Sequence, residues 1–256
     1  MKGLGWIPQR PDPRDFPIEK LHAKFGPPVE IPQAVDLRPK FPVPCYDQGE
    51  LGSCTANATV GAAEFLGYRD AGKYIYRLSR LALYYDVREY EGDPGDDRGA
   101  ELRDVIKVGA KTGLCGEWAW PYNVGKFAVK PPPFAYRNAA THLFTEYYSI
   151  PPETRARDVL AALASGYPVI FGFRVYRQFD EIGPDGICPP MDPGGWPIGG
   201  HAVLAMGYDR IRKLYLIRNS WGPEWGDHGY FWMPFDYAND PDEAGDFWIL
   251  HKEAGI

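Results

Sequence analysis

The sequence predicts an α+β fold with a mainly helical first part and a mainly β second part. Segments in which apolar residues recur at helical spacing come first, and short apolar or alternating runs bounded by turn residues come later. Because the two kinds of segment follow one another and do not alternate, the pattern argues against repeated βαβ units. Glycine and proline contribute 29 and 26 of the 256 residues, which indicates a loop-rich fold and excludes a helical bundle.

Four helices are expected in the order of the chain. The first begins close to Cys54, where small and apolar residues follow one another without a proline. The third is expected to stop at Gly113, because glycine is common just after the last turn of a helix. The four expected helices span residues 53–69, 77–89, 102–111 and 154–165.

The strands are expected in the second part of the chain. Three runs have strand character, PVIFGFRV (168–175), AVLAMGY (202–208) and KLYLIR (213–218). A last core strand is expected at 247–250, and the residues before it, 236–246, are interpreted as an acidic tail segment. A second acidic group is interpreted as a solvated turn and not as a calcium loop, because Pro94 breaks the loop pattern; its members are Glu91, Asp93, Asp96 and Asp97.

Residues 1–30 differ from the rest of the chain. Closely spaced prolines forbid a long helix there, namely Pro8, Pro11, Pro13, Pro17, Pro27 and Pro28. We therefore expect an extended N-terminal arm, followed by one domain over residues 31–256. Within this domain a helical lobe is expected at about 45–135 and a β lobe at about 136–250.

Composition and charge exclude several classes of protein. With 28 basic and 34 acidic side chains the net charge is −6, so no general basic field exists to attract nucleic acid. No stretch approaches the roughly 18 apolar residues of a membrane span, and residues 1–10 lack the apolar core of a signal peptide. This favours a cytoplasmic protein, or an exported one if a leader is missing from this sequence, and the compartment stays open.

Cys54 is the first candidate for chemistry, in the segment Gln48-Gly-Glu-Leu-Gly-Ser-Cys54. The positive end of a helix dipole stabilises a thiolate placed at the helix start. The side-chain amide of Gln48 can donate to an oxyanion beside the Cys54 backbone N–H. The other three cysteines, Cys45, Cys115 and Cys188, form no C-x-x-C pair, which argues against structural zinc and leaves their pairing open.

Two further segments carry a histidine and an asparagine. His201 follows two glycines and opens a strand-like run, and Asn219 leaves a strand into the turn Asn-Ser-Trp-Gly. An asparagine in such a place can orient an imidazole, while Trp221 shields their hydrogen bond from water.

Together these three segments resemble the papain family of cysteine peptidases. The resemblance rests on Gln48 to Cys54, on His201-Ala202-Val203, and on Asn219-Ser-Trp-Gly with Trp225-Gly and Gly229-Tyr230. His201 and Asn219 lie 147 and 165 residues after Cys54, close to the family spacing of about 130–150. Weaker similarity extends over roughly residues 31–250. The resemblance implies a two-lobed fold, with a helical lobe, a barrel-like antiparallel β lobe and the active-site cleft between them.

The resemblance also implies a role for each residue. Cys54 is the expected nucleophile, His201 the general base and acid and Asn219 its orienting group, while Gln48 and the Cys54 N–H form the oxyanion hole. The expected enzyme is a cysteine endopeptidase that hydrolyses peptide bonds through a thioester. It needs no metal or organic cofactor, acts on polypeptides, and is expected to be a monomer. In this family the thiol pKa falls to about 3–4.

Substrate contacts are expected at Gly99, Trp196 and Trp221, with a preference for a hydrophobic residue at P2, the second position before the cleaved bond. The sequence departs from the family at Thr55, where an aromatic residue is usual, and at Gly200, where an acid or amide is common. The long pro-domain of the family is missing, so residues 1–30 are expected to be either a remnant pro-segment or a permanent arm that lies on the surface or across the groove. Two alternatives stay open, a transpeptidase or amide ligase with the same acyl-enzyme, and a non-catalytic pseudo-peptidase.

Overall fold

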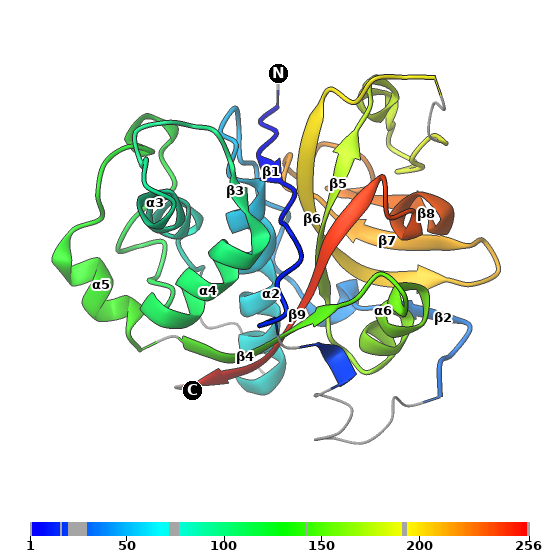
Figure 1. The fold of residues 1–256 in the computed structure, drawn as a ribbon, viewed down its shortest axis with the longest axis horizontal. Coiled ribbons are helices and arrows are strands. Elements are labelled where there is room, and N and C mark those ends of the chain that lie inside the picture. Colours follow the sequence, from blue (N-terminus) through cyan, green and yellow to red (C-terminus); the bar gives the residue numbers. More distant parts are fainter. Residues whose placement is uncertain are drawn as a thin grey trace.

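The fold combines a group of helices with a seven-stranded antiparallel sheet, which lie side by side (Figure 1). The computed structural model describes residues 2–15, 17–19, 30–71, 77–141, 143–190 and 194–254. The helices in this part of the chain are α2 (Cys54–Ala71), α3 (Arg80–Tyr90), α4 (Leu102–Thr112), α5 (Pro133–Ala139), α6 (Arg155–Ala164) and α7 (Phe235–Asn239). Short 3-10 turns occupy Arg38–Lys40, Val124–Lys126 and Arg177–Glu181.

The sheet has the strand order β4-β9-β5-β6-β7-β8, and β2 pairs with β6 outside this path. Every pairing in it is antiparallel. The strands are β2 (Ala34–Asp36), β4 (Leu143–Ile150), β5 (Val169–Val175), β6 (Gly199–Asp209), β7 (Leu214–Arg218), β8 (Tyr230–Pro234) and β9 (Ala244–Ala254).

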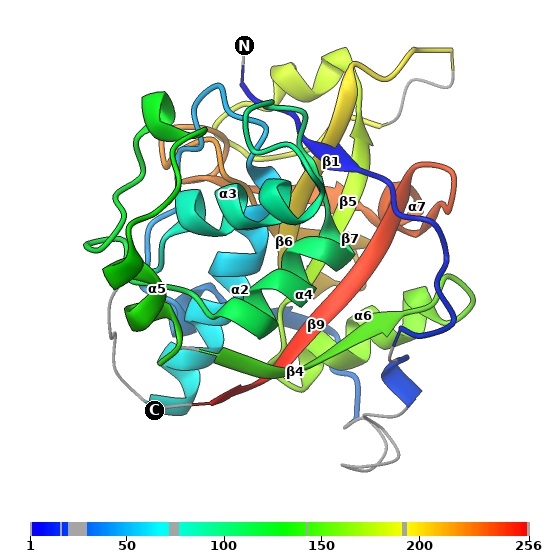
Figure 2. The same cartoon turned by 60° about the vertical axis from the view of Figure 1, so that its left-hand side comes forward.

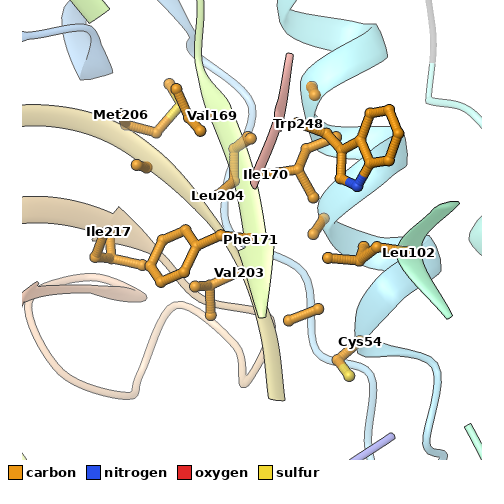
Figure 3. Packing of buried hydrophobic residues seen from close by; sticks show 14 of the residues in the cluster. Cys54, Leu102, Val169, Ile170, Phe171, Val203, Leu204, Met206, Ile217 and Trp248 are labelled. Carbon is orange, nitrogen blue, oxygen red and sulfur yellow. The ribbon is translucent and has the colours of Figure 1, made fainter. Parts of the chain in front are cut away.

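Helix α2 is buried between the other helices and the sheet, and its first turn carries Cys54 (Figure 3). Small residues along α2 let the sheet approach closely. A Cβ atom at Gly61, for example, would lie 3.4 Å from the Leu204 side chain of β6. Because α2 is fixed on several sides, the position of its first residue is also fixed.

Two segments far apart in sequence run side by side next to the start of α2. The backbone N–H of Gln48 donates to the carbonyl of Ser220 (2.8 Å), and Gly222 donates to Tyr46 (2.8 Å). The buried guanidinium of Arg218 donates to the carbonyl of Val43 (2.8 Å). These contacts hold residues 43–48 against the end of β7, so Gln48 and Asn219 are neighbours.

The N-terminal segment runs between the helices and the sheet (Figures 1 and 2). Its strand β1 (Trp6–Ile7) pairs in parallel with β3 (Ala100–Glu101), forming a separate two-stranded sheet. Residues 20–29 of the expected arm lie outside the described residues. None of the helices in the described ranges is long and apolar enough to cross a membrane.

The interpretation of residues 236–246 as an acidic tail is wrong. The segment contains helix α7 and the start of β9, a central strand of the sheet. Asp246 is half-buried and accepts hydrogen bonds from the N-terminal segment. This role was missed, since nothing local distinguishes Asp246 from the exposed acidic residues Asp236 and Asp242.

Candidate active site

Cys54 begins α2, and its side chain is completely buried. The backbone N–H groups of Ala202 and Gly5 face its sulfur. The loop before it is held by Asp97, whose carboxylate accepts from the backbone N–H of Gly52 (3.0 Å) and from the hydroxyl of Tyr84. The sulfur therefore sits between a fixed helix start, strand β6 and the N-terminal segment.

His201 and Asn219 form a buried pair on neighbouring strands. His201 lies on β6, Asn219 follows β7 directly, and the distance from His201 Nε2 to Asn219 Oδ1 is 2.7 Å. Asn219 Oδ1 also accepts from the backbone N–H of Ser220 (2.8 Å), so the asparagine amide is held in one orientation. Among the described residues, Nδ1 of His201 has no hydrogen-bond partner. The next residue, Ala202, directs its backbone N–H at the Cys54 sulfur, so strand β6 carries His201 close to the start of α2.

Trp221 covers this pair. Its ring centroid lies 5.0 Å from that of His201, and Phe173 contacts His201 from another direction at 5.9 Å. Both aromatic side chains are buried. They exclude water from the His201–Asn219 hydrogen bond, as the sequence predicts for Trp221, and this strengthens the bond.

The Gln48 side chain is buried and its amide is fixed at both ends. Its Oε1 accepts from the hydroxyl of Ser220. Its Nε2 donates to the carbonyl of Leu51 (2.7 Å) and to the carbonyl of Gly3 (3.1 Å). The amide nitrogen thus points toward the N-terminal segment beside the start of α2 and already binds a carbonyl oxygen there.

Burial moves both titratable groups toward their neutral forms. Desolvation raises the pKa of Cys54 to about 11, although backbone N–H groups oppose the shift. Desolvation likewise lowers the pKa of His201 to about 4, and the hydrogen bond to Asn219 opposes it. At neutral pH this arrangement therefore holds a thiol and a neutral imidazole, not an ion pair.

The N-terminal segment makes a series of contacts around Cys54. Gly3 N–H donates to the Gly49 carbonyl (3.0 Å), and the carbonyl of Gly5 accepts from Ala100 N–H (2.9 Å). A Cβ atom on Gly5 would lie 1.8 Å from the carbonyl oxygen of Gly52, so only glycine fits there. Farther along, Asp15 forms an ion pair of 2.7 Å with the buried Arg103.

The expected substrate contacts lie in different surroundings. Gly99 has φ = +88°, and a Cβ atom on it would lie 2.1 Å from the Gly5 carbonyl oxygen, so it directly borders the N-terminal segment. Trp196 is 89% exposed. A binding role for Trp196 would require a substrate to cover it, and this role stays a prediction.

Sequence reasoning missed several residues around the site. Asp97 was expected in a solvated turn but its carboxylate fixes the loop before Cys54. Ser220 was passed over as part of a turn, and Asp246 as part of a tail. Asp97 lies in an exposed turn, and no local signal indicates its contacts with Gly52 and Tyr84, whereas Ser220 adjoins Asn219 and was the easier one to find.

No group of three or more His, Cys, Asp or Glu side chains suited to hold a metal ion occurs in the described part of the chain. Cys45, Cys54, Cys115 and Cys188 are all free and buried. This answers the question of pairing that the sequence left open.

Comparison with known proteins identifies the family. Residues 31–242 match the model of the papain family cysteine protease. The chain belongs to the papain family of cysteine proteases. It has the papain-like α+β fold, and as a cysteine-type peptidase it acts on polypeptide substrates.

Two relatives of this papain-family protease match nearly the whole chain, and a third matches most of it. An uncharacterized peptidase C1-like protein of Acanthamoeba polyphaga mimivirus is 36% identical over 98% of this chain and 87% of its own length. Among solved structures, xylellain, a cysteine protease from Xylella fastidiosa, is 36% identical with a TM-score of 0.87, covering 98% of this chain and 96% of its own. Procathepsin L of Felis catus is 30% identical over 82% of this chain, which corresponds to 63% of the relative.

Proposed function

We propose that this protease is an endopeptidase in which Cys54 is the nucleophile. His201 is its general base and acid, Asn219 orients the imidazole, and Gln48 with the Cys54 backbone N–H binds the oxyanion. The observation that carries the assignment is the buried 2.7 Å contact between His201 Nε2 and Asn219, which leaves Nδ1 without a hydrogen-bond partner among the described residues. The next residue of the same strand, Ala202, directs its backbone N–H at the Cys54 sulfur. An imidazole held in this way can take and return one proton.

The reaction follows from these positions. His201 takes the proton of the Cys54 thiol, and the sulfur attacks the peptide carbonyl carbon, so that its oxygen becomes an anion. Gln48 Nε2 and the Cys54 N–H stabilise this anion, and its collapse breaks the C–N bond while the imidazolium protonates the leaving amine. A water molecule, deprotonated by His201, then cleaves the thioester and releases the acid and the thiol.

We further propose that residues 2–9 occupy the substrate cleft in cis. The carbonyl of Gly3 binds Gln48 Nε2, the group assigned to the oxyanion, and Gly5 faces both the sulfur and Ala100. A substrate cannot use these groups while the segment is docked. The arm therefore acts as an inhibitor that must leave before catalysis.

The direction of the arm supports inhibition without self-cleavage. If the Gly3 carbonyl were the one attacked, the residues after Gly3 would lie on the leaving-group side of the bond. They run instead along Gly99, Ala100 and Glu101, where the family resemblance places the residues that precede the cleaved bond. The arm thus runs opposite to the expected substrate, and its peptide bond is not aligned for attack.

Labelling with an epoxide inhibitor of papain-like peptidases tests the proposed function. Intact mass and peptide mapping should show one adduct, on Cys54, that is lost in Cys54→Ala. If neither the full chain nor an arm-displaced variant such as Gly5→Ala reacts, the protein is better described as a non-catalytic pseudo-peptidase.

Product analysis with an added amine separates hydrolysis from transpeptidation. If the amine captures most of the acyl group, the protein is a transpeptidase or ligase.

The protonation state of Cys54 should differ between docked and displaced states. With the arm docked, Cys54 is completely buried and its thiol pKa is about 11, so little thiolate forms between pH 6 and pH 9. We expect the full chain to show almost no ultraviolet absorbance from a Cys54 thiolate in this range. Gly5→Ala, in which solvent reaches the pair, should show a constant thiolate absorbance that is lost when Cys54→Ala is added; equal absorbance in the full chain and in Gly5→Ala would contradict the proposal.

Ser220 is proposed as a positioning residue for Gln48. Its hydroxyl holds Oε1, which directs Nε2 toward the oxyanion. Ser220→Ala should lower kcat about 10-fold with little change in KM, because the lost contact matters most when negative charge develops. Ser220→Thr keeps the hydroxyl and should retain most of the activity. An equal loss in both variants would indicate a packing role instead.

A further inference from the structure

The indole of Trp6 occupies a slot next to the nucleophile. Trp6 is 7% exposed and directly follows Gly5, whose backbone N–H faces the Cys54 sulfur. Whatever side chain enters this slot therefore belongs to a residue beside the reacting atoms.

The floor of the slot consists of glycines on three adjacent strands, β9, β5 and β6. Ideal Cβ atoms would lie 2.1 Å from the indole at Gly172, 2.9 Å at Gly200 and 3.7 Å at Gly245. Gly172 and Gly245 are paired across β5 and β9. Glycine inside a strand weakens the strand, and it commonly marks a close approach by another group. Here the missing side chains leave a flat surface with room for a planar ring.

Asp246 lies at the edge of the slot and accepts a hydrogen bond from Trp6 Nε1 (2.8 Å). The same oxygen accepts from the backbone N–H of Gln9 (3.0 Å). Asp246 has φ = +57°, a conformation uncommon outside glycine and asparagine, so the backbone is turned specifically at this position. Burial raises the pKa of its carboxyl group to about 6, although the hydrogen bonds from Gln9 and Trp6 oppose the shift.

In the proposed function a substrate side chain enters this slot when the arm leaves. We propose that Asp246 is the specificity-determining residue of the slot in this protein. The favoured side chain is a flat aromatic one with an N–H donor, tryptophan above all. The proposal rests on the proposed function, because a substrate must replace the arm. The floor and the acceptor belong to the body of the protein and remain when the arm leaves. A sheltered carboxyl group without a donor is costly, so a substrate that supplies one binds better than an equally large apolar substrate.

The test compares matched peptides on the full chain carrying Trp6→Ala, which empties the slot. The peptides differ at one position, which holds tryptophan, benzothienylalanine, leucine or arginine. Benzothienylalanine has the shape of tryptophan with sulfur in place of the N–H. We expect kcat/KM for tryptophan to exceed that for benzothienylalanine by about 10-fold. Equal rates for these two, or a preference for arginine, would overturn the proposal, and this comparison needs no change in the pocket.

Two variants of Asp246 provide the matched controls. Both asparagine and glycine tolerate the positive φ. Asp246→Asn keeps an acceptor oxygen without the charge and should retain the preference for tryptophan. Asp246→Gly removes the acceptor and should bring the ratio close to one. An unchanged ratio in Asp246→Gly would show that Asp246 does not select the side chain.

A binding measurement separates this proposal from the proposed function. The full chain carrying Cys54→Ala and Trp6→Ala cannot form an acyl-enzyme, yet its slot is open. Calorimetric titration with the same peptides should rank tryptophan above benzothienylalanine by about 10-fold in Kd. Selective binding without turnover in the Cys54-containing protein would overturn the proposed catalysis and keep the pocket. Turnover without selectivity would overturn the role of the pocket and keep the proposed catalysis.

Discussion

Replacing Cys54 with alanine in the arm-displaced protein is expected to lower kcat/KM by at least about 10⁴-fold. The nucleophile and its base act as one unit, and removing either from such a unit leaves only the contribution of binding and of the oxyanion hole. His201→Ala should cause a loss of similar size. The double variant should be no less active than either single variant, since the second change removes a group that has already lost its partner.

Steady-state rates on a fluorogenic peptide measure this effect, with Cys188→Ala as the matched control. Cys188 is also buried and free. It contacts Pro189 and lines a small cavity with Tyr176 and Tyr237, and this cavity does not include Cys54. Its loss should leave kcat/KM within about twofold. If Cys54→Ala retained one tenth of the activity, the nucleophile would have to be another group.

The sequence carried enough local information to predict the elements on which the proposed reacting residues lie. Cys54 opens a helix, His201 lies on a strand and Asn219 directly follows one, and each lies in or next to a segment whose pattern indicates that element. The antiparallel pairing of β6 and β7 then brings the last two together. This pairing was not predicted; the expectation that Asn219 orients His201 rested on the residue types and on the resemblance to the papain family.

The contacts of the arm could not be predicted in the same way. Trp6 and Asp246 are 240 residues apart. The sequence around each of them shows no pattern that predicts a contact with the other. Gly3 and Gly5 look like ordinary loop residues, although the close approach of Gly5 to the Gly52 carbonyl requires its missing side chain. Such contacts depend on the folded surfaces of both partners. Gly200 is a related case, because its departure from the family pattern makes room for Trp6.

Replacing Trp6 with alanine in the full chain is expected to raise kcat/KM on short peptides by about 100-fold. The indole is buried and donates to Asp246, and removing a buried tryptophan costs about 3–5 kcal/mol in a protein core. Part of that cost falls on arm docking, so the docked fraction decreases. The increase in kcat/KM reaches a limit when the arm is undocked most of the time, because the variant changes the docked fraction and not the rate of the chemical step.

Gly5→Ala tests the same equilibrium without removing any contact. Its added methyl group would overlap the backbone of Gly52, which cannot move without shifting the loop that leads to Cys54. Arg14→Ala is the matched control in the same arm, because its side chain is 84% exposed and its ion pair is with Asp12, its neighbour in the arm. We expect activation in Trp6→Ala and in Gly5→Ala but not in Arg14→Ala, measured as initial rates at several peptide concentrations. If both arm variants matched the parent protein, residues 2–9 would not block the cleft in solution. Because the body residues remain unchanged in all three, a gain confined to the first two variants can only come from the docking of the arm.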